Sequence, residues 1–174
     1  MEERGRVSRK TVLAASVGLL CAGCGTSGLN PIVLDGYELD ASLVTQQIDD
    51  VLRLHVPRAV LRDNPQLSTD AEFVEAIARS GSQGQLGREG IRAALYALYR
   101  GESELGFYGL EAASTEDADR LESLLRGIWA HNASFDRARV HRGGKVLVVV
   151  WNDGVSTSTW EAVNAVVVER LAVP

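Results

Sequence analysis

The sequence predicts an α+β protein in which a helical N-terminal half is followed by a sheet-forming C-terminal half. Helical spacing of apolar residues recurs before residue 100, whereas a strictly alternating segment and a continuous apolar run occupy 137–142 and 146–151. With 174 residues, 45% hydrophobic and 24% charged, the chain suits one globular domain, and its composition excludes the collagen-like and disordered classes.

Three helices are expected in the N-terminal half. Apolar spacing predicts helices over 40–55 and over 88–100. Between them, the capping box at 69–72 begins a helix that the glycines of 81–84 end. Residues 32–37 precede these helices as a short strand or an extended lead-in, so 32–100 is expected to be mainly a helical segment.

The C-terminal half, 101–174, alternates strands and helices. The expected order is a strand over 104–111, a helix over 114–131, strands over 137–142 and 146–151, and a helix from a capping box at 158–161 to about 171. This order matches the split βαβ plan of ferredoxin-like folds, in which the third strand lies between the first two. Because a ferredoxin-like sheet has a fourth strand, that strand is either missing or supplied by 32–37. Residues 32–174 are expected to form one domain.

The predicted hairpin has two different faces. A two-residue turn at 143–144 pairs Val140 with Leu147, which leaves one face wholly apolar and ready to receive both helices of the unit. The other face is half apolar and half cationic. Either the N-terminal helices cover it, or it binds a partner protein, a peptide or a second copy of the chain. In the second case, the binding residues are Arg137, Arg139, His141, Val146 and Val148.

The N-terminus has the pattern of an export signal. Basic residues between 4 and 10 precede an apolar run over 11–23. At about 1.5 Å per residue this run covers about 20 Å, which is shorter than the roughly 30 Å hydrocarbon core of a bilayer. A signal peptide over 1–23 is therefore expected rather than a permanent transmembrane helix.

The end of this run, Leu20-Cys21-Ala22-Gly23-Cys24, resembles the lipobox of bacterial lipoprotein precursors. The resemblance implies that Cys24 is lipidated and becomes the new N-terminus of a protein anchored in the cell envelope, at the outer membrane of a Gram-negative host. Residues 24–31 are then a short tether, and no thiol remains in the mature chain. The alternative is an ordinary signal peptide that is cleaved nearby.

The charge of the mature chain limits its partners. Removing 1–23 takes away four basic and two acidic residues, so 151 residues remain with 14 basic and 21 acidic side chains and a net charge of −7. An acidic body without a basic stripe is not expected to bind nucleic acid. It is also not expected to lie flat on anionic lipid.

Few residues are candidates for catalysis. The three histidines are scattered, no nucleotide-binding loop is present, and we expect neither a metal nor a cofactor. Carboxylates are the remaining option: Glu104 or Glu111 could pair with Asp153 for acid/base hydrolysis, although all three also suit strand-edge and turn positions. The first expectation is thus a non-enzymatic, lipid-anchored binding or structural module, and the alternative is a cell-envelope hydrolase.

Overall fold

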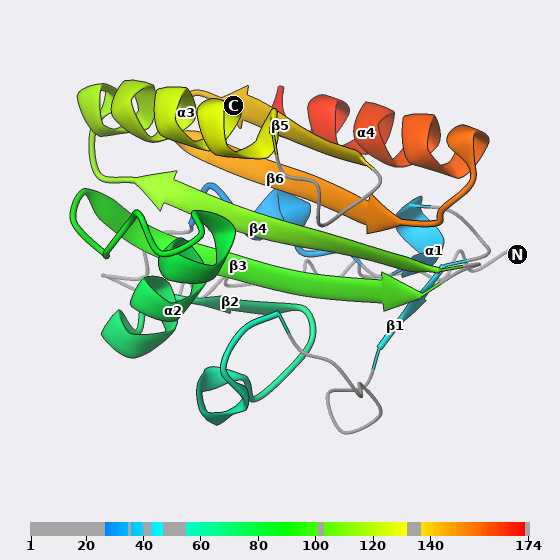
Figure 1. Cartoon of the computed structure of the whole chain (residues 1–174), viewed down its shortest axis with the longest axis horizontal. Helices are drawn as coiled ribbons and strands as arrows, with labels where there is room; N and C mark the ends of the chain where they lie inside the picture. The colour runs from blue at the N-terminus through cyan, green and yellow to red at the C-terminus, as the bar shows by residue number, and fades with distance from the viewer. Residues whose placement is uncertain are drawn as a thin grey trace, which may run out of the picture.

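The protein is an antiparallel sheet with helices on both faces (Figure 1). The computed structural model describes residues 27–34, 36–39, 43–46, 55–100, 103–131 and 137–172. The predicted signal peptide and Cys24 lie outside the described residues, as does Asp40, the predicted start of the first helix.

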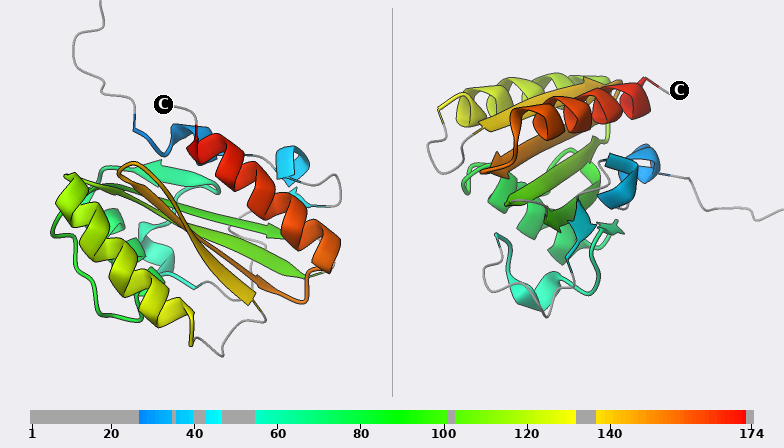
Figure 2. Two further views of the ribbon diagram at one scale, coloured as in Figure 1. Left: turned by 90° about the horizontal axis from the view of Figure 1, so that it is seen from above. Right: turned by 90° about the vertical axis from the view of Figure 1, so that its right-hand side faces the viewer.

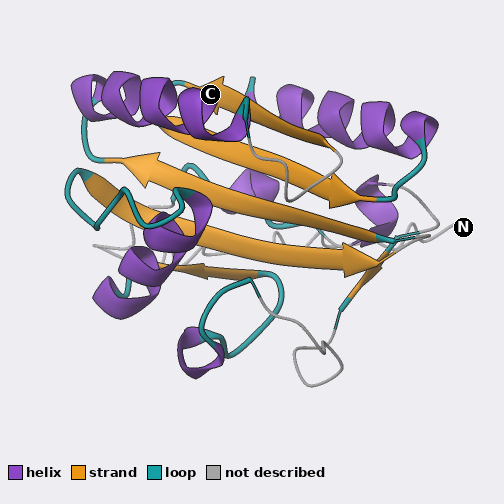
Figure 3. Cartoon of the chain, viewed as in Figure 1, coloured by secondary structure: helices purple, strands orange, loops and turns teal. Residues whose placement is uncertain are grey.

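The element order mixes helices and strands along the whole chain (Figure 3). The helical elements are η1 (Asn30–Ile32), α1 (Gly36–Leu39), η3 (Arg58–Val60), α2 (Ala71–Gly81), α3 (Thr115–Trp129) and α4 (Thr157–Leu171). The strands are β1 (Val44–Thr45), β2 (Gln66–Ser68), β3 (Ile91–Arg100), β4 (Glu104–Ala112), β5 (Arg137–Gly143) and β6 (Val146–Asp153). The predicted α+β class is therefore confirmed.

The six strands form one sheet in the order β1-β3-β4-β6-β5, with β2 also paired to β3. Every pairing is antiparallel. The apolar strand β6 lies between β4 and β5, which is the position predicted for the third strand of the unit. However, α3 and α4 lie on opposite faces of the sheet (Figure 2). The expectation that both helices pack on one face, as in a ferredoxin-like fold, is wrong.

Strand β3 pairs with β4 and takes the place of the fourth strand, which was expected to be missing or supplied by 32–37. The prediction of a helix over 88–100 is therefore wrong. Tyr96 and Leu98 point into one core, whereas Leu95 and Tyr99 point into the other. Both faces of β3 are covered, so its sequence is apolar at nearly every position and lacks the alternation of a half-exposed strand. Its spacing of large apolar residues therefore fitted a helix equally well.

The described residues of 32–100 do not form the expected helical layer. Strand β1 and its pairing with β3 replace part of the predicted helix over 40–55. The 3-10 turn η1 and the single turn α1 replace the strand or lead-in expected over 32–37. Helix α2 is confirmed, with the Asp70 side chain accepting hydrogen bonds from the amides of Glu72 and Phe73.

Two separate cores lie on the two faces of the sheet. The α2/α3 face buries the apolar sides of α2 and α3 against β3, β4, β5 and β6. The α4 face buries α4 and the N-terminal residues Leu29, Ile32, Leu34, Leu39 and Leu43 against the opposite side of β3, β4 and β6. In Figure 2, β5 and β6 pass between α3 and α4, so the sheet is the middle layer of three.

The register of the β5–β6 hairpin differs from the prediction by two residues. Val140 pairs with Val149, and the turn residues are Gly144 and Lys145. Gly144 has a φ of +57°, which favours glycine at this turn position. A shift of two residues leaves every side chain on its predicted face.

Candidate functional site

The binding face predicted on the hairpin is largely an internal interface. Val146 and Val148 are buried on the α4 face, where α4 and the N-terminal residues cover them. Arg139 on β5 donates two hydrogen bonds of 2.8 and 2.7 Å to the carboxylate of Glu161 on α4. Its guanidinium also lies 5.5 Å from the ring centroid of Trp160. The valines are therefore not open to a partner, because α4 crosses to this face instead of joining α3.

His141 belongs to the same internal interface. Its Nε2 lies 2.6 Å from Oδ1 of Asn164 on α4, and the Nδ2 of Asn164 donates to the Trp160 carbonyl at 2.7 Å. Burial lowers the pKa of His141, although the hydrogen bond with Asn164 opposes this effect. These contacts join β5 to α4 through a half-buried polar link.

The outer side of β5 remains open. β5 is the last strand in the sheet order, and a groove of about 520 Å³ runs between this strand and α3. We call it the β5 groove. Its lining residues are Arg126, Trp129, Ala130, Ala138, Arg139, Val140 and His141. Trp129 is fixed in the groove wall because its indole N–H donates to the Gly81 carbonyl at 2.7 Å.

Arginines and carboxylates form ion pairs around the β5 groove. Arg142 contacts Asp119 and Glu122 at 2.6 and 2.8 Å, and Arg126 contacts Glu122 at 2.8 Å. Hydrogen bonds from Arg142 and then Arg126 hold the pKa of Glu122 below its usual range. On the other side of the strand, hydrogen bonds from Arg139, followed by the charges of Arg139 and Arg137, lower the pKa of Glu161. The groove is thus bordered by four arginines and three carboxylates, in a chain whose formal net charge is −5.

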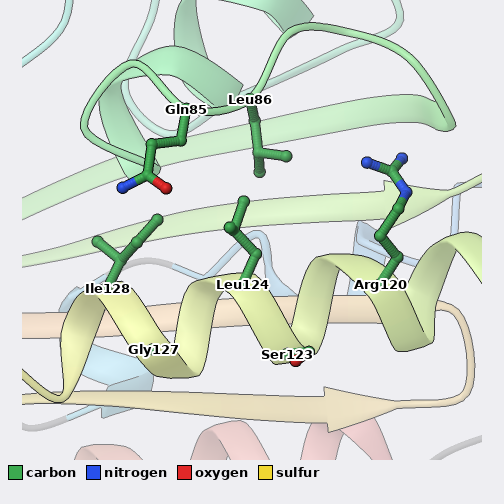
Figure 4. A pocket seen from close by; sticks show the side chains of 7 residues that line it. All are labelled: Gln85, Leu86, Arg120, Ser123, Leu124, Gly127 and Ile128. Carbon is green, nitrogen blue, oxygen red and sulfur yellow. The ribbon is translucent and has the colours of Figure 1, made fainter.

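A second groove lies on the opposite side of α3 (Figure 4). It has a volume of about 690 Å³ and lies between α3 and the loop at 85–86. The Leu86, Leu124 and Ile128 side chains form its apolar part, and Figure 4 shows Gln85 and Arg120 at opposite ends of this group. A Cβ added at Gly127 would meet no atom within 4 Å, so this groove is open along the helix.

The structure brings together two of the three candidate catalytic carboxylates. Glu104 on β4 is the register partner of Asp153 on β6, and both follow the alternation that faces α2 and α3. The Oε2 of Glu104 lies 3.5 Å from Nε2 of His55, a residue not singled out in the sequence. The His55 ring packs edge-on against Trp151, with ring centroids 4.5 Å apart. Trp151 fits here because Gly106 lies beneath its indole ring, where an added Cβ would overlap it.

Glu111 lies far from this pair. It is at the other end of β4, on the α4 face, and only 5% of it is exposed. Its Oε2 accepts hydrogen bonds from the Ser27 hydroxyl at 2.5 Å and the Gly28 amide at 2.9 Å. Arg92 lies 3.6 Å from the other carboxylate oxygen. Glu111 therefore holds the N-terminal segment, and it does not meet Asp153 in one cleft.

Two tyrosines lie beneath the α2/α3 face near His55. Burial raises the pKa of both Tyr96 and Tyr108 above the ordinary tyrosine value, so both phenols are neutral at physiological pH. Their rings lie 5.7 Å apart, and Tyr108 also contacts the rings of Trp129 and Trp151. This aromatic group forms part of the core that supports the β5 groove.

Over the described part of the chain, no three histidine, cysteine or acidic side chains gather in a way that could hold a metal ion. None of the helices described is both long enough and apolar enough to cross a membrane.

The fold and site define an α+β protein with an antiparallel sheet between helices and a groove along its edge strand. Comparison with protein-family models, curated proteins and solved structures gives no match to this chain.

Neither groove was predicted from the sequence, because each depends on where α3 lies relative to residues distant in the chain. Gly127, a glycine inside an otherwise regular helix, is a local feature of the sequence that marks the second groove.

Proposed function

We propose that this chain is a lipid-anchored protein of the cell envelope that binds an extended acidic segment of a partner protein and catalyses no reaction. The observation that carries the proposal is the β5 groove, where an unpaired strand edge lies beside a helix. The predicted binding residues Arg139 and His141 line this groove, although their side chains also contact α4.

The shape of the groove favours an extended partner. In an antiparallel ladder, every second residue directs its backbone N–H and C=O away from the paired strand. No described segment pairs with the outer edge of β5, so these groups are available to an added strand. Trp129, Ala138 and Val140 supply apolar contacts for alternate side chains of that strand.

The charge of the groove favours an acidic partner. The four arginines that border it outnumber the three carboxylates with which they pair, which leaves a net charge of +1 at the groove. Arginines on an edge strand also discourage pairing with an uncharged or basic strand of another molecule. An acidic segment offers opposite charge to these residues, which favours both the encounter and the choice of partner.

The proposed test uses two synthetic peptides, one alternating valine with glutamate and the other alternating valine with lysine. Each is titrated into the isotope-labelled mature protein in detergent micelles, and backbone amide shifts are followed by NMR. We expect the glutamate peptide to shift amides of β5 and of the end of α3, and the lysine peptide to shift neither. Binding of both peptides equally, or shifts confined to other elements, would contradict the proposal.

A matched pair of variants locates the binding. Ala130 is an exposed residue at the C-cap of α3 that lines the β5 groove, so Ala130→Trp fills it. Ala165 is an exposed residue of α4 outside this groove, and Ala165→Trp is the control. We expect Ala130→Trp to weaken binding of the glutamate peptide by about tenfold or more, as for a blocked central contact, and Ala165→Trp to leave it unchanged.

The proposed anchor is supported by the signal-like N-terminus and its resemblance to lipoprotein precursors at Cys24. Two acyl chains or more would give stable membrane attachment. The Cys24→Ala variant is expected to appear in the soluble fraction, whereas the unaltered chain sediments with membranes and carries the mass of the lipid. A Cys24→Ala protein that remains in the membrane fraction would refute the anchor.

One observation favours a second function, hydrolysis by paired carboxylates. Glu104 and Asp153 face one another on neighbouring strands, where Cβ atoms lie about 4.5–5.5 Å apart. Retaining glycosidases use carboxyl groups about 5–5.5 Å apart, and side chains whose Cβ atoms are this close can place their carboxyl groups at that separation. Release of reducing sugar from purified cell-wall glycan, lost in both Glu104→Gln and Asp153→Asn, would support this function. No release by the unaltered protein would exclude it for that substrate.

A further inference from the structure

The N-terminal segment is fixed to the body from the first described residue. Ser27 and Gly28 both donate hydrogen bonds to Glu111, and the amide of Leu29 donates to the Ser27 hydroxyl at 3.2 Å. Leu29 and Ile32 are fully buried in the core of the α4 face. We call Ser27–Ile32 the N-terminal latch. The described part of the tether predicted over 24–31 is therefore held against the sheet, with Leu29 buried.

The latch lies at one end of the sheet. Glu111 pairs in register with Val146, next to the β5–β6 turn at Gly144 and Lys145. A Cβ on Gly28 would lie only 2.8 Å from the Val146 side chain, so the latch backbone lies directly on β6. In the left view of Figure 2, the blue N-terminal segment begins beside the C-terminal end of α4. We call this the turn end of the sheet.

The distance from the proposed lipid to the latch is short. Cys24 precedes Ser27 by three residues, and an extended chain spans at most about 3.6 Å per residue. Ser27 therefore lies within about 11 Å of the lipidated residue. An eight-residue tether would have allowed more than twice this separation and any orientation of the body.

We propose that the turn end of the sheet faces the bilayer and that the opposite end, with Glu104 and Asp153, points away from it. The inference rests on the proposed lipid anchor. Residues 104 and 111 of β4 are separated by about 24 Å along the strand, which is more than twice the reach of the three-residue link. The latch thus fixes which end of the sheet is near the membrane.

The charge of the turn end suits this placement. Lys145 is the only lysine of the mature chain, and it is exposed on the turn. Its ammonium group makes no ion pair with the described residues. Arg170 lies beside it in a groove of about 410 Å³ that Gly28 and Glu111 also line. A cation at this end favours the anionic bilayer surface, in a body that is acidic overall.

The test uses single cysteines at the two ends of α4. The anchored mature chain is proposed to have no other free thiol, so Ala172→Cys at the turn end and Thr157→Cys at the opposite end can each be labelled with a fluorophore. Both residues are exposed, and they flank a helix of 15 residues. The labelled lipoproteins are reconstituted in vesicles of phosphatidylcholine and phosphatidylglycerol that contain nitroxide-headgroup lipid.

We expect quenching at Ala172→Cys to be at least about threefold stronger than at Thr157→Cys, since the two sites are separated by about 22 Å along the helix. Equal quenching, or stronger quenching at Thr157→Cys, would overturn the orientation. Lys145→Cys and Asp153→Cys form a second pair on the sheet itself, and they apply the same comparison if either helix variant does not fold.

Two outcomes separate this inference from the anchor on which it rests. A labelled protein that does not float with the vesicles contradicts the anchor. A protein that floats but shows no difference between the two ends contradicts the orientation alone. The double variant Ser27→Ala/Glu111→Gln weakens the latch, and it is expected to reduce the difference in quenching at least about twofold while flotation is unchanged.

Discussion

The two faces of the sheet are covered in different ways. On the α2/α3 face, two regular helices of 11 and 15 residues begin at caps and supply most of the covering side chains. On the α4 face, the covering side chains come from one regular helix, from the latch and from the short elements that follow the latch. The helices that cover the α2/α3 face are determined by residues close together in the sequence, such as their caps. The cover of the α4 face depends on contacts between residues more than 80 positions apart, such as Ser27 and Glu111.

The largest expected effect is the loss of stability on shortening a buried leucine. It tests whether the latch on the α4 face is as much a part of the core as helix α3 on the other face. Leu29 in the latch and Leu121 on α3 are both fully buried. Leu29→Ala and Leu121→Ala are each expected to lower the free energy of unfolding by about 2–5 kcal/mol. Chemical denaturation measures both values. A loss below about 0.5 kcal/mol for Leu29→Ala alone would show that the latch is not integral to the core.

The next largest effect is expected from removing the N-terminal caps of α3 and α4, one helix on each face. The Ser114 hydroxyl accepts from the Asp117 amide at the start of α3, and the Ser156 hydroxyl accepts from the Thr159 amide at the start of α4. Each substitution to alanine is expected to lower the free energy of unfolding by about 1 kcal/mol. Thermal and urea unfolding provide the measurement. If only Ser114→Ala destabilises the protein, the cap of α4 does not contribute to stability.

The α4 face should also be the more sensitive to acid, because His141 lies within it. Burial depresses the pKa of His141 in the folded protein, so the unfolded chain binds this proton first as the pH falls below about 6.5. The stability linked to neutral His141 is therefore present above that pH and is lost as the pH falls further. We expect unfolding free energy to fall more between about pH 7.5 and pH 5.5 in the unaltered protein than in His141→Gln.

His131, an exposed residue just after α3, provides the control for this pH dependence. Comparison with His131→Gln shows whether the effect of removing a histidine is particular to the α4 face. An identical loss of stability in the unaltered protein and in His141→Gln would contradict the assigned role of the His141–Asn164 contact.

The smallest expected effect concerns the exposed ion pair that joins β5 to α4. Arg139 and Glu161 form a two-point contact, but both side chains are about half exposed. A double-mutant cycle with Arg139→Ala and Glu161→Ala should give a coupling energy below the effect of either serine cap. The coupling should decrease further in about 1 M salt, where the screening length is about 3 Å. A coupling that salt does not change would contradict an electrostatic origin.

Sequence reasoning succeeded where the determinants were local. The serine before α3, the helical spacing within α2 and α3, and the alternation in β5 each identify an element from a few adjacent residues. The position of β6 in the sheet followed from an apolar run that only a doubly covered strand requires.

Sequence reasoning failed where the structure depends on contacts between residues far apart in the sequence. The β3 segment carries apolar side chains on both faces, and nothing within 91–100 separates such a strand from a buried helix. The cap of α4 is Ser156 and not Ser158, because several consecutive hydroxyl residues offer competing starts. Likewise, the β5 groove and the pairing of Glu104 with Asp153 depend on the sheet register, and the role of Glu111 depends on the latch.

The latch also has a consequence for the order in which the protein is completed during synthesis. Leu29 rests against Gly109, and its neighbours Ser27 and Gly28 donate hydrogen bonds to Glu111, so none of this site exists when the latch is made. At roughly 5–20 residues per second, the ribosome adds these partners several seconds later. Although they are translated before the sheet, the latch residues are therefore among the last to reach their final positions. Any enzyme that acts on the neighbouring Cys24 during this interval meets a chain whose N-terminal latch is not yet docked.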